Sequence, residues 1–531
     1  MSSKLLYLRS VTAKPGSLMH GFVPFPAERA AAYRAAGYWS GRPLASLLDD
    51  AAERWPDRAA VIDPTTTLTY AELDVAANRA AAGLHGLGIA PGDRVLLQLP
   101  NSVAFAVVLF GLLRVGAIPV LCLPGHRAAE IGHLAAVSDA VGIVIPDATA
   151  GFDYPAMAAE LGLRRIIIDD TADGPPAPRF SPDPATPAVL LVSGGTTGLP
   201  KLIPRTHNDY VYNATASAQV CELTAEDVYL VALPAAHNFP LACPGLLGAI
   251  SVGAATVFGT DPSPEAAFAT ITSHRVTVTA LVPALATLWA HACDWEPQKP
   301  TTLRLLQVGG AKLAADDARR IREVLTPGLQ QVFGMAEGLL CYTRPGDGAE
   351  LLDATQGRPL CADDELRVVD EDGVEAPEGE LLVRGPYTIN GYYNAPEANA
   401  RSFSPDGFYR SGDRVRRLAN GYLEVTGRIK DVIVRGGENI AAEELEAHLL
   451  RHPAIQSAAA VGLPDKYLGE KICAAIVFNG TSLSLPELNR HLAEQGAATH
   501  VRVDQLAALT TLPTTAVGKI DKKAIIRQLV G

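Results

Sequence analysis

Alternating helix and strand patterns run along most of this 531-residue chain, and they restrict its fold more than any other feature. Helical periodicity from Tyr70 to Leu87 is followed by a strand pattern over Arg94–Leu99, and a helix and a buried strand then occupy 103–123. Alternation of this kind favours α/β architecture with largely parallel sheets. The chain is therefore predicted to be an α/β protein.

Composition and charge exclude several classes of protein. The chain is 48% hydrophobic and 19% charged, so it can bury large cores, and its length suggests about three to four structural units. A net charge of −12 argues against a broad nucleic-acid-binding face. The most apolar stretch, 103–123, is interrupted by Arg114, Gly116 and Pro119, which favours a core helix over a membrane span. Seven scattered cysteines without a CxxC pair, and no signal-peptide pattern, favour a reduced cytoplasmic protein.

Two changes of texture divide the chain. From Glu365 the pattern changes to short strands, Glu365–Val369 and Glu380–Arg384, which predict a small β-rich subdomain. A second boundary falls at Gly427–Asp431, followed by an α+β unit with a helix from about Ala441. We therefore predict an N-terminal domain of α/β subdomains plus the β-rich one over 1–429, and a small C-terminal domain over 430–531.

A glycine- and threonine-rich loop follows the apolar run Ala188–Val192. Glycines allow backbone N–H groups to approach an anion, hydroxyls donate further hydrogen bonds, and a lysine supplies positive charge. The loop differs from a Walker A motif, because its glycine spacing is different and Leu202 follows the lysine. It predicts a phosphate site made by Ser193, Gly194, Gly195, Thr196, Thr197, Gly198 and Lys201.

Four further residues could support phosphate chemistry, although each has an ordinary alternative. Glu337 could hold Mg²⁺, but a single loop glutamate is usually solvated. Asp413 could accept hydrogen bonds from ribose hydroxyls or be a turn aspartate. Lys519, after Gly518 near the C-terminus, could be a surface lysine, and His237 a buried core histidine. Taken singly, none of them defines a function.

Taken in order, these segments resemble the adenylate-forming superfamily of acyl-CoA synthetases, adenylation domains of peptide synthetases and luciferases. The resemblance rests on Ser193–Lys201, Phe333–Glu337, Gly385–Tyr393, Tyr409–Asp413, Gly427–Glu438 and Gly518-Lys519. Within it, the runs Lys201–His207, Ala236–Leu241 and Gln331–Gly338 resemble the stand-alone aryl-acid–AMP ligases of siderophore and nonribosomal peptide synthesis.

The resemblance implies a large core and a small mobile C-terminal domain that carries a catalytic lysine. The implied reaction converts an aromatic carboxylic acid and ATP, with Mg²⁺, to aryl-AMP and pyrophosphate. The aryl group would then pass to the phosphopantetheine thiol of a separate aryl carrier protein. An aryl-CoA ligase that uses free CoA is the alternative, and a non-catalytic nucleotide-binding relative is a third reading.

The resemblance also implies roles for individual residues. Lys519 and His237 would be catalytic, the loop 193–201 would hold the β- and γ-phosphates, and Glu337 would bind Mg²⁺. The remaining nucleotide contacts would come from Gly309, Gly310, Ala311 and Phe333 at the adenine and from Asp413 and Arg428 at the ribose. Lys430 would be the hinge at which rotation replaces Lys519 by the loop 435–438.

The aryl-acid pocket is expected to comprise Asn238, Phe239, Cys243, Gly309 and Leu340. Asn238 stands where amino-acid-activating relatives carry an aspartate, and an amide offers no counter-charge to an ammonium group. Cys243 replaces a serine that is common in dihydroxybenzoate-type members, and Leu340 replaces a smaller valine. A thiol is a weaker donor than a hydroxyl, so both changes favour salicylate over 2,3-dihydroxybenzoate. A substituted salicylate or a hydroxy-heteroaryl acid remains an alternative.

Overall fold

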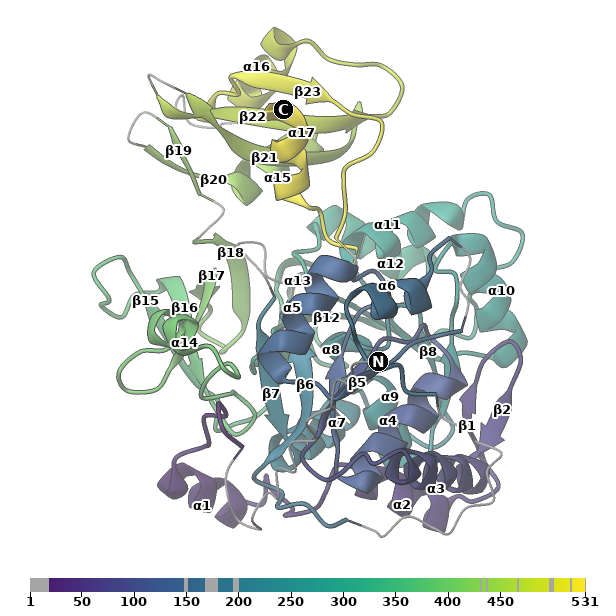
Figure 1. The fold of residues 1–531 in the computed structure, drawn as a ribbon. Helices are drawn as coiled ribbons and strands as arrows, with labels where there is room; N and C mark the ends of the chain where they lie inside the picture. Colours follow the sequence, from purple (N-terminus) through teal and green to yellow (C-terminus); the bar gives the residue numbers. More distant parts are fainter. Residues whose placement is uncertain are drawn as a thin grey trace, which may run out of the picture.

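The protein consists of a large N-terminal unit and a smaller C-terminal unit, as drawn in the computed structural model of Figure 1. The structure describes residues 19–147, 151–167, 180–193, 200–429, 432–435, 438–465, 468–495, 501–515 and 518–530. Most of the predicted phosphate loop (194–199) and the predicted hinge Lys430 lie outside these ranges. The α/β class predicted from the sequence is confirmed for the large unit.

The larger sheet of the described residues has nine strands in the order β14-β13-β12-β11-β10-β8-β9-β1-β2. The pairs from β1 to β12 across its centre are parallel, and the edge pairs are antiparallel. Its strands are β1 (Ala59–Ile62), β2 (Thr67–Thr69), β8 (Val228–Val231), β9 (Ala255–Phe258), β10 (Val278–Leu281), β11 (Leu305–Gly309), β12 (Leu329–Gly334), β13 (Leu340–Tyr342) and β14 (Arg358–Pro359). The parallel strands β11 and β12 end side by side, which places the loops after Gly309 and Gly334 at one edge.

A second sheet carries the predicted phosphate loop between its last two strands. Its order is β5-β3-β4-β6-β7, and β6 pairs antiparallel with β7. The strands are β3 (Arg94–Leu97), β4 (Ile118–Leu121), β5 (Gly142–Val144), β6 (Pro187–Val192) and β7 (Leu202–Thr206). The loop therefore connects neighbouring strands of a buried sheet.

Helices cover both sheets, and their ends follow from local sequence. Thr69 and Glu72 form a capping box at the start of α3, and Thr206 and Asp209 form another at the start of α7. The helices of the large unit are α1 (Ala27–Ala35), α2 (Ser46–Arg54), α3 (Tyr70–Gly86), α4 (Val103–Val115), α5 (Ala128–Ser138), α6 (Tyr154–Glu160), α7 (His207–Val220), α8 (Asn238–Ala242), α9 (Gly245–Val252), α10 (Pro264–His274), α11 (Pro283–Ala292), α12 (Ala315–Val324) and α13 (Ala349–Ala354).

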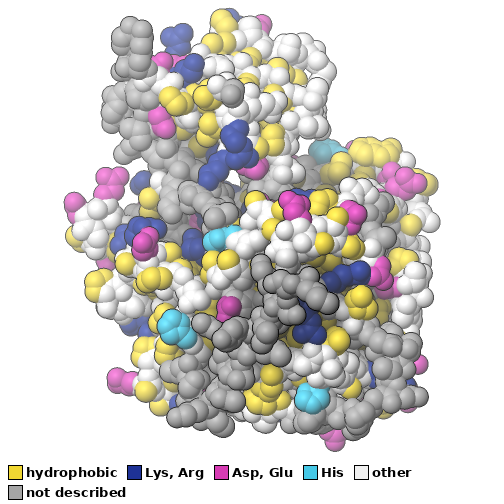
Figure 2. All heavy atoms as spheres, in the orientation of Figure 1, with side chains coloured by type: hydrophobic (Ala, Val, Ile, Leu, Met, Phe, Trp, Pro, Cys, Tyr) yellow, Lys and Arg dark blue, Asp and Glu magenta, His cyan; other side chains and the backbone are white. Residues whose placement is uncertain are grey.

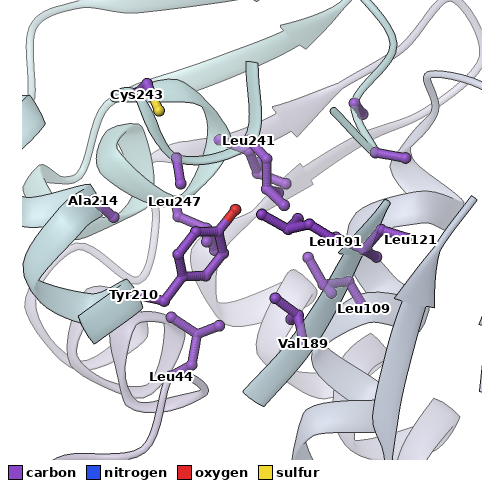
Figure 3. Packing of buried hydrophobic residues seen from close by; sticks show 14 of the residues in the cluster. Leu44, Leu109, Leu121, Val189, Leu191, Tyr210, Ala214, Leu241, Cys243 and Leu247 are labelled. Atoms are coloured by element: carbon purple, nitrogen blue, oxygen red, sulfur yellow. The ribbon is translucent and has the colours of Figure 1, made fainter. Parts of the chain in front are cut away.

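The apolar stretch 103–123 is a core helix followed by a buried strand, as predicted. Helix α4 begins after Ser102, whose side chain accepts a hydrogen bond from the Phe105 N–H, and ends at Gly116 in the left-handed conformation (φ +80°). The side chains of α4 pack in a core shared with α7, α8 and α9 (Figure 3). Within the described residues, no helix combines the length and hydropathy required to cross a membrane.

The predicted β-rich subdomain is confirmed as a separate antiparallel sheet in the order β15-β16-β17-β18 (Figure 1). Its strands are β15 (Glu365–Val369), β16 (Glu378–Arg384), β17 (Tyr409–Arg417) and β18 (Leu423–Arg428), with helix α14 (Pro396–Ser402) beside them. Asp413 on β17 is in register with Arg428 on β18.

The C-terminal unit is an α+β layer with its own core. Strands run in the order β20-β19-β22-β21, and β23 pairs with β22. The elements are β19 (Val432–Arg435), β20 (Glu438–Ala441), α15 (Ala442–Leu450), β21 (Ile455–Asp465), β22 (Gly469–Phe478), α16 (Leu485–Glu494), β23 (Gln505–Ala508) and α17 (Lys522–Val530). The segment before α17 extends from this unit down to the large one (yellow in Figure 1), and it carries Lys519.

Candidate active site

Lys519 lies in a tight turn that reaches the N-terminal unit. Thr514 pairs with Ile520, and the Thr515 N–H donates to the Lys519 carbonyl at 2.6 Å. A Cβ built on Gly310, just beyond β11, would lie 3.2 Å from Cε and 3.9 Å from Nζ of Lys519. Gly310 has a φ of +91°, so a side chain there would strain the backbone as well as crowd the lysine. The turn therefore places the Lys519 ammonium at the carboxyl end of the central sheet.

The electrostatic surroundings of Lys519 include Asp413 and Arg428, which are predicted to bind nucleotide, and Glu337, which is predicted to bind Mg²⁺. Protein atoms around the side chain remove water from it, and this desolvation lowers the pKa of the ammonium. Arg428 lowers it further, whereas the carboxylates of Asp413 and Glu337 raise it. Two cations, Lys519 and Arg428, thus lie within electrostatic range of two carboxylates, Asp413 and Glu337. On the face in Figure 2, several Lys and Arg side chains lie where the two units meet.

Glu337 is buried in the loop between β12 and β13 and belongs to a tyrosine network. The Tyr392 hydroxyl donates to Glu337 Oε1 at 2.7 Å, and the Tyr392 and Tyr409 hydroxyl oxygens lie 3.1 Å apart. Burial and the neighbouring Glu337 raise the pKa of Tyr392, so this hydroxyl stays protonated as a donor. Lys201 Nζ lies 4.7 Å from the centre of the Tyr392 ring, within the range of a cation–π contact. Tyr392 therefore joins the phosphate-loop lysine to the proposed magnesium ligand.

The ends of the predicted phosphate loop are fixed by hydrogen bonds. Ser193 Oγ accepts from the Lys201 N–H at 2.9 Å, and the Ser193 N–H donates to the Lys201 carbonyl at 2.9 Å. Gly194, Gly195, Thr196, Thr197 and Gly198 lie outside the described residues. Two hydrogen bonds therefore hold the ends of the segment, Ser193 and Lys201, next to each other.

Asp413 is buried and paired with Arg428. Arg428 Nε donates to Asp413 Oδ1 at 2.6 Å, and the Asp413 N–H donates to Ser411 Oγ at 3.0 Å. Gly412 between them has a φ of +70°, which allows the turn that presents the carboxylate. The two residues predicted at the ribose are therefore direct neighbours, and their role there stays a prediction.

The predicted adenine contacts come from the ends of adjacent parallel strands. Gly309 at the end of β11 is in register with Val332 of β12, so Gly310 and Phe333 follow each other across the same edge. Phe333 is partly buried, and Gly310 and Ala311 are exposed. The residues predicted to contact adenine therefore lie together at the ends of two adjacent strands.

Four of the predicted aryl-acid residues form one buried group around the start of α8, namely Asn238, Phe239, Cys243 and Gly309. A Cβ on Gly309 would lie 3.1 Å from Cζ of Phe239, so the ring packs directly on that glycine. Asn238 Nδ2 donates to Cys243 Sγ at 3.4 Å, and the thiol donates to the Asn238 carbonyl at 3.4 Å. Burial raises the pKa of Cys243 to about 12, so the sulfur is a neutral thiol at pH 7. Leu340, buried on β13, packs against Gly334.

His237 connects this pocket to the lysine. It caps α8, and its Nδ1 accepts from the Phe239 N–H at 3.3 Å. Burial, together with repulsion by Lys519, lowers the pKa of His237 to about 4. The ring is therefore neutral at pH 7 and keeps its proton on Nε2 as a hydrogen-bond donor.

Some predicted features are not placed in this site. Arg435, from the loop predicted to exchange with Lys519, instead forms a double hydrogen bond with Asp504 within the C-terminal unit, both N···O distances being 2.7 Å. Lys430 lies outside the described residues. The sequence analysis did not identify Tyr392 and Tyr409, although Tyr392 lies in the segment Gly385–Tyr393 that carried part of the resemblance.

The fold, together with the charged residues gathered around Lys519, is that of an adenylate-forming enzyme with a large N-terminal and a small C-terminal unit. Residues 48–393 match the AMP-binding enzyme family, and residues 444–519 match the AMP-binding enzyme C-terminal domain. The chain therefore belongs to the AMP-binding enzymes.

Sequence comparison shows which named AMP-binding enzymes this chain resembles. The chain is 65% identical over 542 residues to the salicyl-AMP ligase / salicyl-S-ArCP synthetase of Mycobacterium tuberculosis, covering 97% of this chain and 96% of the relative. It is 45% identical over 525 residues to the 2,3-dihydroxybenzoate-AMP ligase of Bacillus subtilis, covering 96% and 97%.

Solved structures agree with the fold. The apo structure of Mycobacterium smegmatis MbtA is 65% identical and superposes with a TM-score of 0.75 over 96% of this chain and 99% of that one. ATP-bound MatB from Rhodopseudomonas palustris, at 23% identity, superposes with a TM-score of 0.82 over 91% and 98%, and is similar in fold.

Proposed function

We propose that the protein activates salicylate with ATP to salicyl-AMP and pyrophosphate and then transfers the salicyl group to the thiol of a separate carrier protein. The observation that carries the proposal is the position of Lys519, beside Gly310 and within the electrostatic reach of Asp413 and Glu337. The 65% identity to a protein named salicyl-AMP ligase / salicyl-S-ArCP synthetase supports the substrate and the acceptor.

The first step requires charge neutralisation rather than a base. A benzoic acid is ionised at pH 7, so its carboxylate can attack the α-phosphorus directly and expel pyrophosphate. Two anions must approach, and a cation held near both of them stabilises the negative charge that develops in the transition state. Lys519 is suited to this task because its ammonium lies beside Gly310 and interacts electrostatically with both His237 and Asp413. Neutral His237 adds an N–H donor on the pocket side.

The Glu337 carboxylate fits a magnesium ion whose other ligands would be phosphate oxygens and water. Glu337 offers a hard carboxylate ligand, and the described residues contain no cluster of three or more metal-binding side chains. Mg²⁺ typically binds one or two carboxylates together with phosphates and water, and it would supply charge neutralisation at the pyrophosphate. Tyr392 and Tyr409 orient Glu337, and Lys201 contributes a second positive charge beside it.

The pocket favours salicylate over larger aryl acids. The Cys243 thiol has its own partners in Asn238, and its sulfur is a weak partner for a ring 3-hydroxyl. Leu340 fills space beside Gly334 that a smaller residue would leave open. Asn238 provides an amide and no negative charge, which disfavours an ammonium-bearing substrate.

The second step would follow rotation of the C-terminal domain about Lys430, with the domain boundary at 429/430. Arg435 is held by Asp504, so the loop that follows it would move with the C-terminal unit as a body. We propose that this exchange removes Lys519 and admits the phosphopantetheine arm of a cytoplasmic aryl carrier protein. All seven cysteines are free and buried, in keeping with a reduced compartment.

Two assays test the proposal. ATP–pyrophosphate exchange is measured with salicylate, 2,3-dihydroxybenzoate, benzoate and 3-hydroxypicolinate, and salicylate is expected to give the highest kcat/KM. Thioester yield is then compared with a holo aryl carrier protein and with free CoA at equal concentration, and the carrier is expected to be the better acceptor. Absence of salicylate-dependent exchange contradicts the first step, and a clear preference for CoA contradicts the second.

A further inference from the structure

Tyr210, on the second turn of α7, is a fully buried residue whose hydroxyl reaches the aryl-acid pocket. Its relative exposure is 0%, and its hydroxyl donates to Asn238 Oδ1 at 2.9 Å. Aliphatic side chains surround the ring, and the hydroxyl at its tip provides a polar group within that core (Figure 3). A buried hydroxyl of this kind is costly unless its hydrogen bond is made.

A buried arginine holds the Tyr210 ring in place. The Arg205 guanidinium carbon lies 4.7 Å from the ring centre. Arg205 is itself fixed by Asp209 at 2.7 Å and Asn213 at 3.1 Å, and by the carbonyls of Ala336 at 3.0 Å and Tyr387 at 3.2 Å. Because Arg205 is held by these four partners, its guanidinium restrains the Tyr210 ring and so the direction of the hydroxyl.

The contacts of Asn238 give its amide a single orientation. Oδ1 accepts from Tyr210, and Nδ2 donates to Cys243 Sγ. A flipped amide would turn Nδ2 toward the tyrosine and leave the tyrosine hydrogen without an acceptor in a buried site. The Cys243 thiol hydrogen is directed to the Asn238 carbonyl, so it gives a flipped Oδ1 no compensation.

We propose that Tyr210 is a positioning residue that selects the ortho substituent of the aryl acid by fixing the Asn238 amide. With Oδ1 turned to Tyr210, the side of the amide near Cys243 presents N–H groups. The oxygen of an ortho hydroxyl can accept from such a donor while its own hydrogen bonds to the substrate carboxylate. An ortho amine presents hydrogens instead, and two donors facing each other are unfavourable. The inference rests on the proposed aryl-acid function and identifies the ortho substituent as the part of the substrate that Asn238 recognises.

The test compares salicylate with 2-aminobenzoate in ATP–pyrophosphate exchange. Tyr210→Phe keeps the ring and removes the hydroxyl, so the amide can turn. The expected result is a salicylate KM raised roughly two- to tenfold, the effect of one neutral hydrogen bond, and a salicylate to 2-aminobenzoate ratio of kcat/KM lowered by about tenfold. The KM for ATP is expected to stay at the wild-type value. An unchanged ratio in a folded Tyr210→Phe protein overturns the proposal.

A matched control separates positioning from stability. Tyr70 is also fully buried, and its hydroxyl donates to the Ala254 carbonyl at 2.7 Å, away from the site. Tyr70→Phe is expected to lower the melting temperature similarly and leave the substrate ratio unchanged. An equal loss of ratio in Tyr70→Phe would show that general destabilisation is the cause and overturn the proposal.

A second variant keeps the proposal testable if Tyr210→Phe does not fold. Asn238→Asp cannot present an N–H group in either orientation, so its ratio is expected to shift toward 2-aminobenzoate. An unshifted ratio in Asn238→Asp contradicts the inference. Wild-type protein without salicylate-dependent exchange contradicts the proposed function instead, so the two failures are distinguishable.

Discussion

Replacing the Cys243 sulfur by oxygen should change which aryl acid the pocket prefers. Cys243 is 1% exposed and lies against Asn238, with Asn213 Nδ2 at 3.9 Å from the sulfur. A serine hydroxyl is a stronger donor and acceptor than a thiol, and it occupies less space. One neutral hydrogen bond to a ring 3-hydroxyl contributes about 0.5–1.5 kcal/mol, or roughly two- to tenfold in kcat/KM. Cys243→Ser is therefore expected to raise the ratio of kcat/KM for 2,3-dihydroxybenzoate over salicylate by that factor.

The assay for this variant is ATP–pyrophosphate exchange with each acid at saturating ATP. Cys243→Ala is the matched control, because it removes the sulfur without adding a hydroxyl, and it is expected to lack the rise in ratio. Cys122→Ser changes a buried cysteine just after β4 and controls for the loss of packing alone. An unchanged ratio in Cys243→Ser, or an equal rise in Cys243→Ala, would refute the reasoning from hydrogen bonding.

Three buried titratable residues, His207, Asp413 and Glu337, can each be tested by substitution. Burial lowers the pKa of His207 to about 4, below its unfolded value of 6.5, so the unfolded state takes up a proton first as the pH falls. Between pH 7 and pH 5 the free energy of unfolding, measured in urea, should therefore fall by about 2 kcal/mol more in the wild-type protein than in His207→Gln. Parallel curves of this free energy against pH for the two proteins would contradict the prediction. Asp413→Asn weakens the pairing with Arg428, so kcat/KM for ATP should fall roughly ten- to hundredfold while the KM for salicylate stays at the wild-type value. An unchanged kcat/KM for ATP would argue against ribose binding by Asp413. Glu337→Gln should raise the Mg²⁺ concentration that gives half-maximal exchange by about tenfold, and a curve superimposed on wild type would remove Glu337 from the metal site.

The fold could be predicted from local patterns because periodicity and capping are properties of neighbouring residues. The helix predicted over Tyr70–Leu87 is α3, and capping boxes begin both α3 and α16, the latter with Ser484 and Glu487. The parallel centre of the large sheet also agrees with the alternating pattern. Family membership likewise follows from short motifs in a fixed order.

The partners of the site residues could not be predicted in the same way, because they are distant in sequence. Tyr392 contacts Glu337 from 55 residues away, and Tyr210 contacts Asn238 from 28 residues away. The position of Lys519 beside Gly310 depends on how the two units meet, which no local pattern encodes. Motifs therefore identified the charged groups of the site but not the hydroxyls that orient them.

The most direct test of the account separates the two half-reactions in Lys519→Ala. The wild-type geometry places this ammonium beside Gly310 and within electrostatic range of Asp413 and Glu337, so its loss should slow salicylate-dependent ATP–pyrophosphate exchange by about a hundredfold or more. Transfer from supplied salicyl-AMP to a holo carrier protein should proceed at close to the wild-type rate, because the proposed rotation removes Lys519 from the cleft. Exchange within a few-fold of wild type, or equal loss of both half-reactions, would contradict the account.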